Sequence, residues 1–229
     1  TAANWNTPQT VTVTGVDDAI ADGNIAYSIV TVPAASTDAN YGGVDAVDVA
    51  ATNTDNDSPG FTVTPVAGLV TGEAGGVAAF TVVLNTQPIA DVSIGLSSSD
   101  LTEGTVAPAS VTFTAADWST PQTVTATGVD DAIVDGNVAY TVLTAPAASA
   151  DPSYGGVDAA DVAVMNTDND VAGITVTPTA GLTTTEAGGT ATFTVVLATQ
   201  PSADVSIGLS SSDLSEGTVA PASLTFTAA

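Results

Sequence analysis

The chain has 229 residues and a formal charge of −25, with 25 acidic residues and no lysine, arginine or histidine. Nucleic acid and anionic membrane surfaces are therefore poor partners, because both are bound through basic side chains. Charged residues make up only 11% of the chain and hydrophobic residues 44%, a balance that excludes a disordered acidic tail.

Cysteine is absent, and no apolar run reaches the roughly 18 residues that a membrane span needs. No signal peptide is recognisable at the start, which favours a mature or excerpted chain. A small exported domain without disulfides needs another cross-link, and a bound metal is the obvious substitute. We therefore expect an extracellular or cell-surface protein without membrane insertion.

The sequence repeats itself. The block from Val92 to Leu101 recurs unchanged from Val205 to Leu214, 113 positions later, and the same offset separates Trp5 from Trp118. A period of this length suits one β-sandwich domain. The sequence therefore predicts tandem β-sandwiches.

The phase of the repeat predicts one complete unit at residues 58–170. Residues 1–57 then form the C-terminal half of a preceding repeat, and residues 171–229 the N-terminal half of the next. Half a sandwich cannot bury its own apolar face. We expect either a window onto a longer array or a subunit whose halves are completed by neighbours.

Within the complete unit, segments that alternate between valine and threonine are separated by turn residues, without helical periodicity. Valine and threonine suit a pleated, half-buried surface. Alternation alone explains the threonine faces as solvated β surface, which we prefer to an ice-binding surface. We predict an all-β fold with about seven strands per repeat, at residues 61–64, 77–84, 91–98, 111–114, 121–129, 137–143 and 161–166.

Acidic residues cluster where each repeat ends. Asp130, Asp131 and Asp135 share one tight connection between strands, and Asp168 and Asp170 follow the last strand. A single aspartate there would be explained as a turn former. Several neighbouring carboxylates without a base cost free energy, however, and loop carboxylates suit Ca²⁺ better than Mg²⁺. We therefore expect calcium at the seam between sandwiches.

The order of these motifs resembles the Calx-beta domain, known from sodium–calcium exchangers and from tandem arrays in bacterial surface proteins. The motifs are Glu73-Ala74-Gly75-Gly76, the run from Val129 to Asp135, and Asp168-Asn169-Asp170. The resemblance covers the complete repeat and both halves. It implies a seven-stranded immunoglobulin-like sandwich that binds calcium at the end where the last strand leaves.

Position by position, the resemblance implies Ca²⁺ ligands in all three parts of the chain. The sequence departs from the family where Asp22 and Asp135 replace the usual glutamate, and where Asn56 and Asn169 interrupt the closing acidic triplet. A shorter aspartate rearranges a bidentate contact, whereas asparagine can still coordinate through its carbonyl oxygen. The implied ligands are Glu73, Asp100, Asp130, Asp131, Asp135, Asp168 and Asp170 in the complete repeat, Asp17, Asp18, Asp22, Asp55 and Asp57 in the first half, and Glu186 and Asp213 in the last half.

These motifs do not explain the segment from Ala147 to Ala160, whose twin runs from Ala34 to Val47. A second ion site, a contact to a neighbouring chain through Tyr154, and an ordinary mobile loop are all open readings of this segment. We expect Trp5 and Trp118 to pack over a sandwich edge rather than to bind sugar.

These features predict a structural role and no enzymatic activity. The leading prediction is a calcium-rigidified stalk of an extracellular adhesin or the shaft of a surface fibre, whose partners are neighbouring repeats, copies of the chain or a cell surface. The first alternative is a non-covalent filament in which residues 171–229 of one chain and 1–57 of the next complete one sandwich.

Two alternatives belong to other functional classes. A glycosidase built on a carboxylate pair is a weak candidate, because no His, Cys, Lys or Arg can serve in acid–base, nucleophilic or oxyanion roles and because the acids recur in every repeat. A carbohydrate- or partner-binding module would need an exposed aromatic platform, and only 5% of the chain is aromatic.

Overall fold

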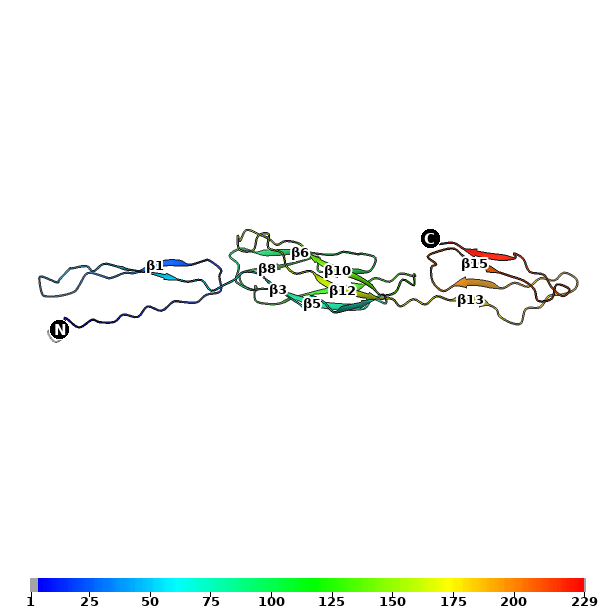
Figure 1. The fold of residues 1–229 in the computed structure, drawn as a ribbon, viewed down its shortest axis with the longest axis horizontal. Coiled ribbons are helices and arrows are strands. Elements are labelled where there is room, and N and C mark those ends of the chain that lie inside the picture. The colour runs from blue at the N-terminus through cyan, green and yellow to red at the C-terminus, as the bar shows by residue number, and fades with distance from the viewer. Residues whose placement is uncertain (1–3, 229) are drawn as a thin grey trace.

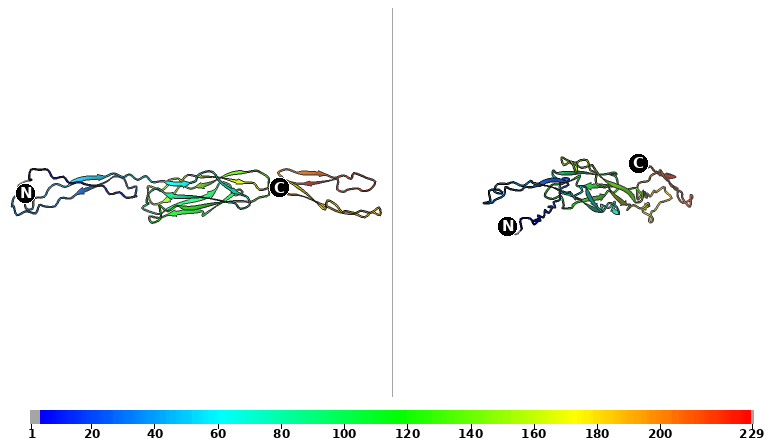
Figure 2. Two further views of the ribbon diagram at one scale, coloured as in Figure 1. Left: turned by 90° about the horizontal axis from the view of Figure 1, so that it is seen from below. Right: turned by 60° about the vertical axis from the view of Figure 1, so that its left-hand side comes forward.

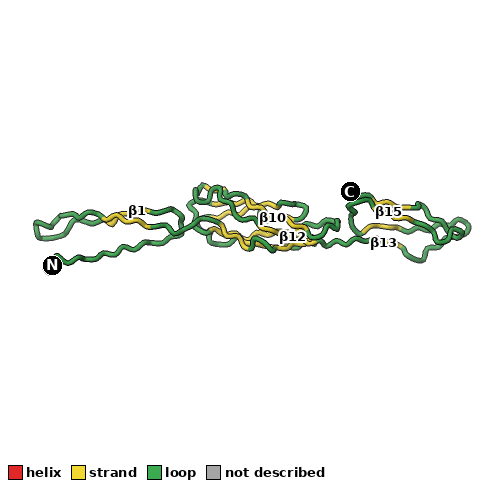
Figure 3. Tube along the Cα trace, viewed as in Figure 1, coloured by secondary structure: helices red, strands yellow, loops and turns green. Residues whose placement is uncertain are grey.

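The computed structural model describes residues 4–228, and every regular element among them is a β-strand. Figure 1 shows three parts along one long axis, an N-terminal segment, a central sandwich and a C-terminal segment, and Figure 3 shows that long loops join the strands. No helix within residues 4–228 is long and apolar enough to cross a membrane. Residues 1–3 and 229, the outer ends of the two predicted half-repeats, lie outside the described part.

The central sandwich consists of two sheets. One has four antiparallel strands in the order β3 (Phe61–Thr64), β5 (Val77–Leu84), β9 (Gln122–Gly128) and β7 (Gly104–Ala107). The other has six, with the path β11 (Ala148–Ser149), β6 (Val92–Ser98), β10 (Val138–Thr144), β12 (Val162–Thr167) and β4 (Leu69–Gly72), and with β8 (Ser110–Phe113) paired to β6. In this sheet β12 and β4 run parallel, and the other pairs are antiparallel.

The sandwich has ten strands where the sequence pattern predicted about seven. The seven predicted segments overlap β3, β5, β6, β8, β9, β10 and β12. The additional strands β4, β7 and β11 have four residues or fewer and lie at sheet edges. Alternation over so few residues gives no usable signal, and such short strands are typical of edges.

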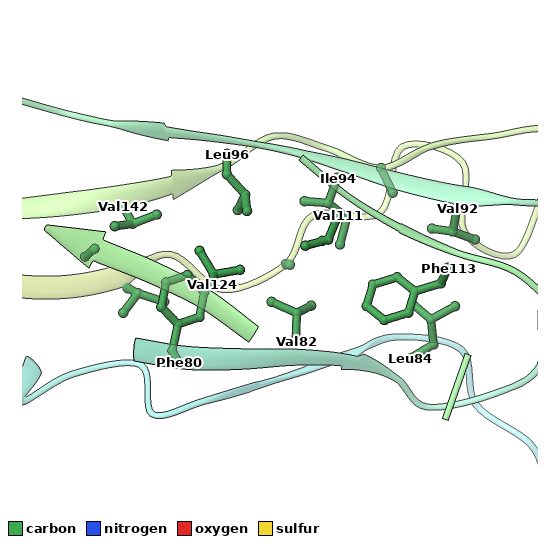
Figure 4. Packing of buried hydrophobic residues seen from close by; sticks show 14 of the residues in the cluster. Phe80, Val82, Leu84, Val92, Ile94, Leu96, Val111, Phe113, Val124 and Val142 are labelled. Atoms are coloured by element: carbon green, nitrogen blue, oxygen red, sulfur yellow. The ribbon is translucent and has the colours of Figure 1, made fainter. Parts of the chain in front are cut away.

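The hydrophobic core lies between the two sheets (Figure 4). Phe80 and Val82 point from β5 toward Ile94 of β6 and Val142 of β10, and each of these side chains is at most 1% exposed. Full burial of one such side chain stabilises the fold by about 1.5–3 kcal/mol. Every buried hydrophobic residue of the described chain falls between positions 80 and 164.

The flanking segments lie beyond opposite ends of the sandwich (Figure 2) and contain no buried residue between 4 and 57 or between 171 and 228. Each is built from two-stranded ladders only. These are β1 (Ile25–Ile29) with β2 (Val49–Asn53), β13 (Ile174–Thr177) with β14 (Thr194–Leu197), and β15 (Val205–Gly208) with β16 (Ser223–Phe226).

Positions that are buried in the sandwich are uncovered in these segments. Val124 is fully buried, whereas Val11, the same repeat position, is 80% exposed; Phe80 is 1% exposed and its twin Phe193 is 38% exposed. In the sandwich the facing sheet, with β6 and β10, covers Phe80 and Val124, whereas β14, the counterpart of β5, pairs only with β13. Exposure of these apolar side chains therefore follows from missing partner strands, not from a change of sequence.

The two tryptophans differ in the same way. Trp118 packs against the hydrophobic core, and its carbonyl accepts a hydrogen bond from the Leu84 N–H at 3.2 Å. Trp5, one repeat earlier, is 81% exposed. The predicted packing over a sandwich edge therefore holds for Trp118 but not for Trp5.

Candidate metal centre

Acidic residues converge at the end of the sandwich where the chain leaves β12. Glu73 follows β4 and Asp168 follows β12, and because these two strands are parallel neighbours, both residues emerge at the same edge. The Glu73 N–H continues the ladder by donating to Thr167 O at 3.2 Å. The Asn169 N–H then donates to Glu73 Oε2 at 2.9 Å, which ties the departing chain to the end of β4.

The loop after β9, residues 130–136, brings three more carboxylates to this edge. Asp131 Oδ1 accepts a 2.7 Å hydrogen bond from the Ile133 N–H, which closes a tight turn. Asp168 Oδ2 accepts from the Gly136 N–H at 2.8 Å, and Asp130 Oδ1 accepts from Asn169 Nδ2 at 3.1 Å. The loop and the departing chain are therefore joined by two hydrogen bonds.

Two groups of three carboxylates share one residue. Glu73, Asp135 and Asp168 offer oxygens within 4.8 Å of one another, and so do Glu103, Asp131 and Asp135. Calcium binds oxygen at 2.3–2.6 Å, so ligands on opposite sides of one ion lie roughly 5 Å apart. The spacing fits two divalent cations that share Asp135.

The two glutamates of the centre are buried and lie close to other acids. Glu73 is 2% exposed and Glu103 is 5% exposed. The hydrogen bond from Asn169 lowers the pKa of Glu73, but burial and the charges of Asp168, Asp131 and Asp135 outweigh it and raise the pKa above its ordinary value. Burial raises the pKa of Glu103 more than its bond from Asn166 lowers it. Both carboxylates therefore resist ionisation unless positive charge is nearby.

Among the buried side-chain atoms of residues 4–228, one carboxylate oxygen has no hydrogen-bond partner. Asp170 Oδ2 is buried and unpaired, although the Asp170 N–H donates to Asp168 Oδ1 at 2.7 Å. Burial and the charge of Asp168 raise the pKa of Asp170, whereas backbone N–H groups of Asp170 and Gly136 lower that of Asp168. An orphaned acceptor beside other carboxylates fits a hard cation, which would satisfy oxygen and charge together.

Asp100, like Asp130 and Asp170, belongs to neither three-acid group. Its Oδ1 accepts from the Thr102 hydroxyl at 2.6 Å and from the Thr102 N–H at 3.0 Å, and these bonds lower its pKa. Its twin Asp213 forms the same turn with Ser215. Both aspartates are thus engaged as turn formers through local bonds to the residue two positions on.

The sequence reasoning missed Glu103 and the buried Asn166. Asn166 is 1% exposed, and its side-chain amide donates to Val129 O at 3.1 Å and to Glu103 Oε2 at 3.4 Å. The sequence did contain a pattern from which Glu103 could have been predicted. The residue lies in a block that recurs unchanged in the next repeat, and it is the only glutamate of residues 58–170 besides Glu73.

The flanking segments hold the remaining predicted ligands in incomplete arrangements. The Gly23 N–H donates to Asp55 Oδ2 at 2.6 Å, as the Gly136 N–H does to Asp168. Burial, followed by the charges of the neighbouring aspartates, raises the pKa of Asp57. No three-acid group within residues 4–228 includes the predicted ligands Asp17, Asp18, Asp22, Asp55, Asp57, Glu186 or Asp213.

Comparison with known proteins gives structural similarities only. No protein-family model matches the chain, and no curated protein matches its sequence. The apo form of the Calx CBD1 domain is 15% identical with a TM-score of 0.38, over 48% of this chain and 96% of that one. The periplasmic chaperone SfaE is 10% identical with a TM-score of 0.39, over 49% of this chain and 60% of that one.

Domains 4 and 5 of the S-layer protein SbsC are 17% identical with a TM-score of 0.31, over 64% of this chain and 70% of those domains. All three TM-scores lie below 0.5, so these similarities carry no conclusion about function. The Calx-beta resemblance stays a prediction, and the all-β architecture rests on the strands themselves.

Proposed function

We propose that this chain is a structural segment of an extracellular or cell-surface repeat protein, in which calcium stiffens the passage from one β-sandwich to the next. The residues that would hold the ions are Glu73, Glu103, Asp130, Asp131, Asp135, Asp168 and Asp170. Bound Ca²⁺ would supply the positive charge that a chain without basic side chains lacks. We propose no catalytic role.

The observation that carries this proposal is the unpaired, buried Asp170 Oδ2, which is under the influence of the charges of Asp168, Asp130, Asp131 and Asp135. Its position gives the mechanical consequence, because Asp170 lies on the chain that leaves β12 for the next segment. An ion held by Asp170 and by the loop at 130–136 would restrict bending there. Without the ion, repulsion among carboxylates would favour a looser joint.

The test is small-angle X-ray scattering of the chain with Ca²⁺ and with EDTA, together with calcium titration by calorimetry. We expect calorimetric binding, and a narrower range of end-to-end dimensions when calcium is present. Mg²⁺ at the same concentration is the matched control, because it demands near-octahedral geometry and dehydrates reluctantly. A scattering profile that is identical with Ca²⁺ and with EDTA would contradict the stiffening role.

A second candidate concerns assembly, and the uncovered faces of the flanking segments favour it. Val11 and Phe193 are exposed although their twins Val124 and Phe80 form the core. Residues 171–229 supply the counterparts of β3, β5, β6 and β8, and residues 1–57 supply those of β10 and β12. The two halves of neighbouring copies could therefore combine into one sandwich by strand complementation.

Analytical ultracentrifugation over a range of concentrations tests this candidate. Val11→Asp should abolish concentration-dependent growth, because it charges a face that would be buried. Thr10→Asp is the matched control, since its twin Thr123 is exposed in the sandwich. Equal assembly by both variants, or a monomer at every concentration, would exclude complementation.

A further inference from the structure

The loop of the N-terminal segment that precedes β1 contacts the sandwich at the end opposite the metal centre. The Gln87 N–H donates to Ala19 O at 2.7 Å, and the Ser153 hydroxyl donates to Ala21 O at 3.4 Å. A cavity of about 360 Å³ lies between the two parts, with Ile20 on one side and Tyr154 on the other. We call the sandwich side, formed by the turn at residues 86–89 and the loop at 151–154, the receiving notch.

We call the contact between the N-terminal segment and the sandwich the first joint, and the contact between the sandwich and the C-terminal segment the second joint. The same hydrogen bond is present at both. The Gln200 N–H donates to Ala132 O at 2.7 Å, and Ile133 forms a parallel β-bridge with Gln200. Gln200 and Ala132 are the repeat counterparts of Gln87 and Ala19. The two joints have different surroundings, but the same hydrogen bond forms at the same repeat position in each. This contact is therefore a feature of the repeat.

Buried hydrogen bonds hold the receiving notch in shape. Tyr154 is fully buried, its hydroxyl accepts from the Thr86 N–H at 3.0 Å and donates to Thr86 O at 2.8 Å, and its ring packs edge-on against Phe61. Asp151 is 3% exposed, and its carboxylate accepts from the Ile89 N–H and the Ser153 N–H, each at 2.8 Å. The loop and the turn thus form one preformed surface.

The long segment from Ala147 to Ala160 acquires a role from this arrangement. Five backbone hydrogen bonds shape it, among them Gly155 N–H to Asp151 O and Gly156 N–H to Ala147 O, both at 2.8 Å. The twin segment at 34–44 has the same bonds although its Tyr41 is 64% exposed. The loop conformation is therefore local in origin, and packing of Tyr154 fixes the loop against the turn.

Burial of the loop at residues 17–22 depends on both parts of the notch, the turn at 86–89 and the loop at 151–154. Ala19, Ile20 and Ala21 are half-buried, while the three aspartates of the loop are exposed. At the second joint residues 171–228 provide the counterpart of the turn but not of the loop at 151–154, and there Ala132 and Val134 are exposed. The apolar tip of the loop is thus the part that docks, and Asp17, Asp18 and Asp22 remain exposed at its sides.

We propose that the receiving notch is the docking site for the apolar tip of the preceding repeat's acidic loop, Ala19-Ile20-Ala21, and that this contact fixes the orientation of successive repeats without an ion. The notch recognises a short apolar loop tip whose main-chain carbonyl groups accept hydrogen bonds. The docking contact itself needs no ion, since its hydrogen bonds join main-chain and hydroxyl groups. At the second joint, however, the tip Ala132-Ile133-Val134 lies between the proposed calcium ligands Asp131 and Asp135, so the first joint gives the cleaner test.

The test measures distances between spin labels in the full chain, which has no cysteine and so accepts engineered pairs cleanly. Labels at Ala50 and Thr112 span the first joint, and labels at the repeat counterparts Ala163 and Thr225 span the second; all four positions are exposed. We expect narrow distance distributions across the first joint in EDTA as well as in calcium. A broad distribution in EDTA would overturn a clamp that works without an ion.

Variants on each side of the contact test whether docking of the loop tip in the notch restricts the joint. Ile20→Asp should broaden the distribution across the first joint and leave the second unchanged, and Ile133→Asp should do the converse. Ser153→Trp, which fills the notch while leaving the backbone bonds of Asp151 in place, should broaden the first joint alone. Unchanged widths in Ile20→Asp and Ser153→Trp would overturn the proposal.

Discussion

The main-chain N–H of Asn169 donates a 2.9 Å hydrogen bond to Glu73 Oε2, joining residues 96 positions apart. Glu73 directly follows the short strand β4, and Asn169 lies on the chain that leaves β12 for the next segment. The carboxylate is 2% exposed and lies among other acids. A change in its charge should therefore act on ion binding and on the departing chain at once.

Glu73→Gln should have opposite effects with and without calcium. Calcium affinity should fall by on the order of tenfold, because ligand charge strongly tunes affinity. The metal-free sandwich at neutral pH should become more stable, because a buried carboxylate with a raised pKa is removed. Calorimetry and denaturant unfolding check the two effects, with Glu186→Gln, the exposed twin, as control. Equal effects of Glu73→Gln and Glu186→Gln would contradict a metal centre that includes Glu73.

Glu103→Gln tests whether two ions share Asp135. If Glu103 belongs to a second ion site, the variant should lower the calorimetric stoichiometry or weaken one of two binding steps. Glu216→Gln, the exposed counterpart in the C-terminal segment, should leave the titration unchanged. An unaltered titration of the Glu103 variant would limit the centre to Glu73, Asp135 and Asp168.

The pH dependence of stability should change sign with calcium. The pKa values of Glu73 and Glu103 are raised above the ordinary 4.5, so the folded state binds their protons more tightly than the unfolded state. Their contribution is fully present below 4.5 and is lost as the pH rises through the folded pKa values. In EDTA, the free energy of unfolding should therefore fall as the pH rises above 4.5.

With calcium the same pH change should increase stability, because the ion competes with protons for the carboxylates. Urea unfolding monitored by Trp118 fluorescence, at several pH values, checks both directions. The double variant Glu73→Gln with Glu103→Gln should flatten the slope in EDTA. A slope in EDTA that the double variant does not alter would assign the effect to other acids.

Phe80→Ala and Phe193→Ala should separate the core from the uncovered faces. Phe80 is 1% exposed between the sheets, and its truncation should cost about 3–5 kcal/mol of unfolding free energy. Phe193, 38% exposed, should cost about 1 kcal/mol or less in a dilute, monomeric chain. A large loss for Phe193 in that monomeric chain would contradict its exposed position and would mean that the C-terminal segment buries this side chain within the chain itself.

Tyr154→Phe should destabilise the sandwich by about 1–3 kcal/mol, because it leaves the buried Thr86 N–H and hydroxyl without their partner. Tyr41→Phe is the matched control, since Tyr41 is 64% exposed. Thermal unfolding followed by circular dichroism checks the difference. Equal melting temperatures for the two variants would show that the hydroxyl of Tyr154 does not hold the turn.

The sequence by itself determined the all-β class, because valine–threonine alternation with a period of two leaves little room for a helix. It also placed carboxylates in the connections after β9 and β12, since these acids are adjacent in the chain. Both inferences depend only on residues that are close together in the sequence. The short edge strands β4, β7 and β11 escaped for the same reason, since they carry too few residues to show a period.

Only the tertiary structure decided which acids meet. Parallel pairing of β4 with β12 brings Glu73 to Asn169, and the turn before β7 brings Glu103 to Asp131 and Asp135. Asp100, an equally plausible ligand in sequence, is instead engaged by Thr102. Burial and ligand spacing arise from strand pairing between distant segments, and such pairing leaves no trace in local periodicity.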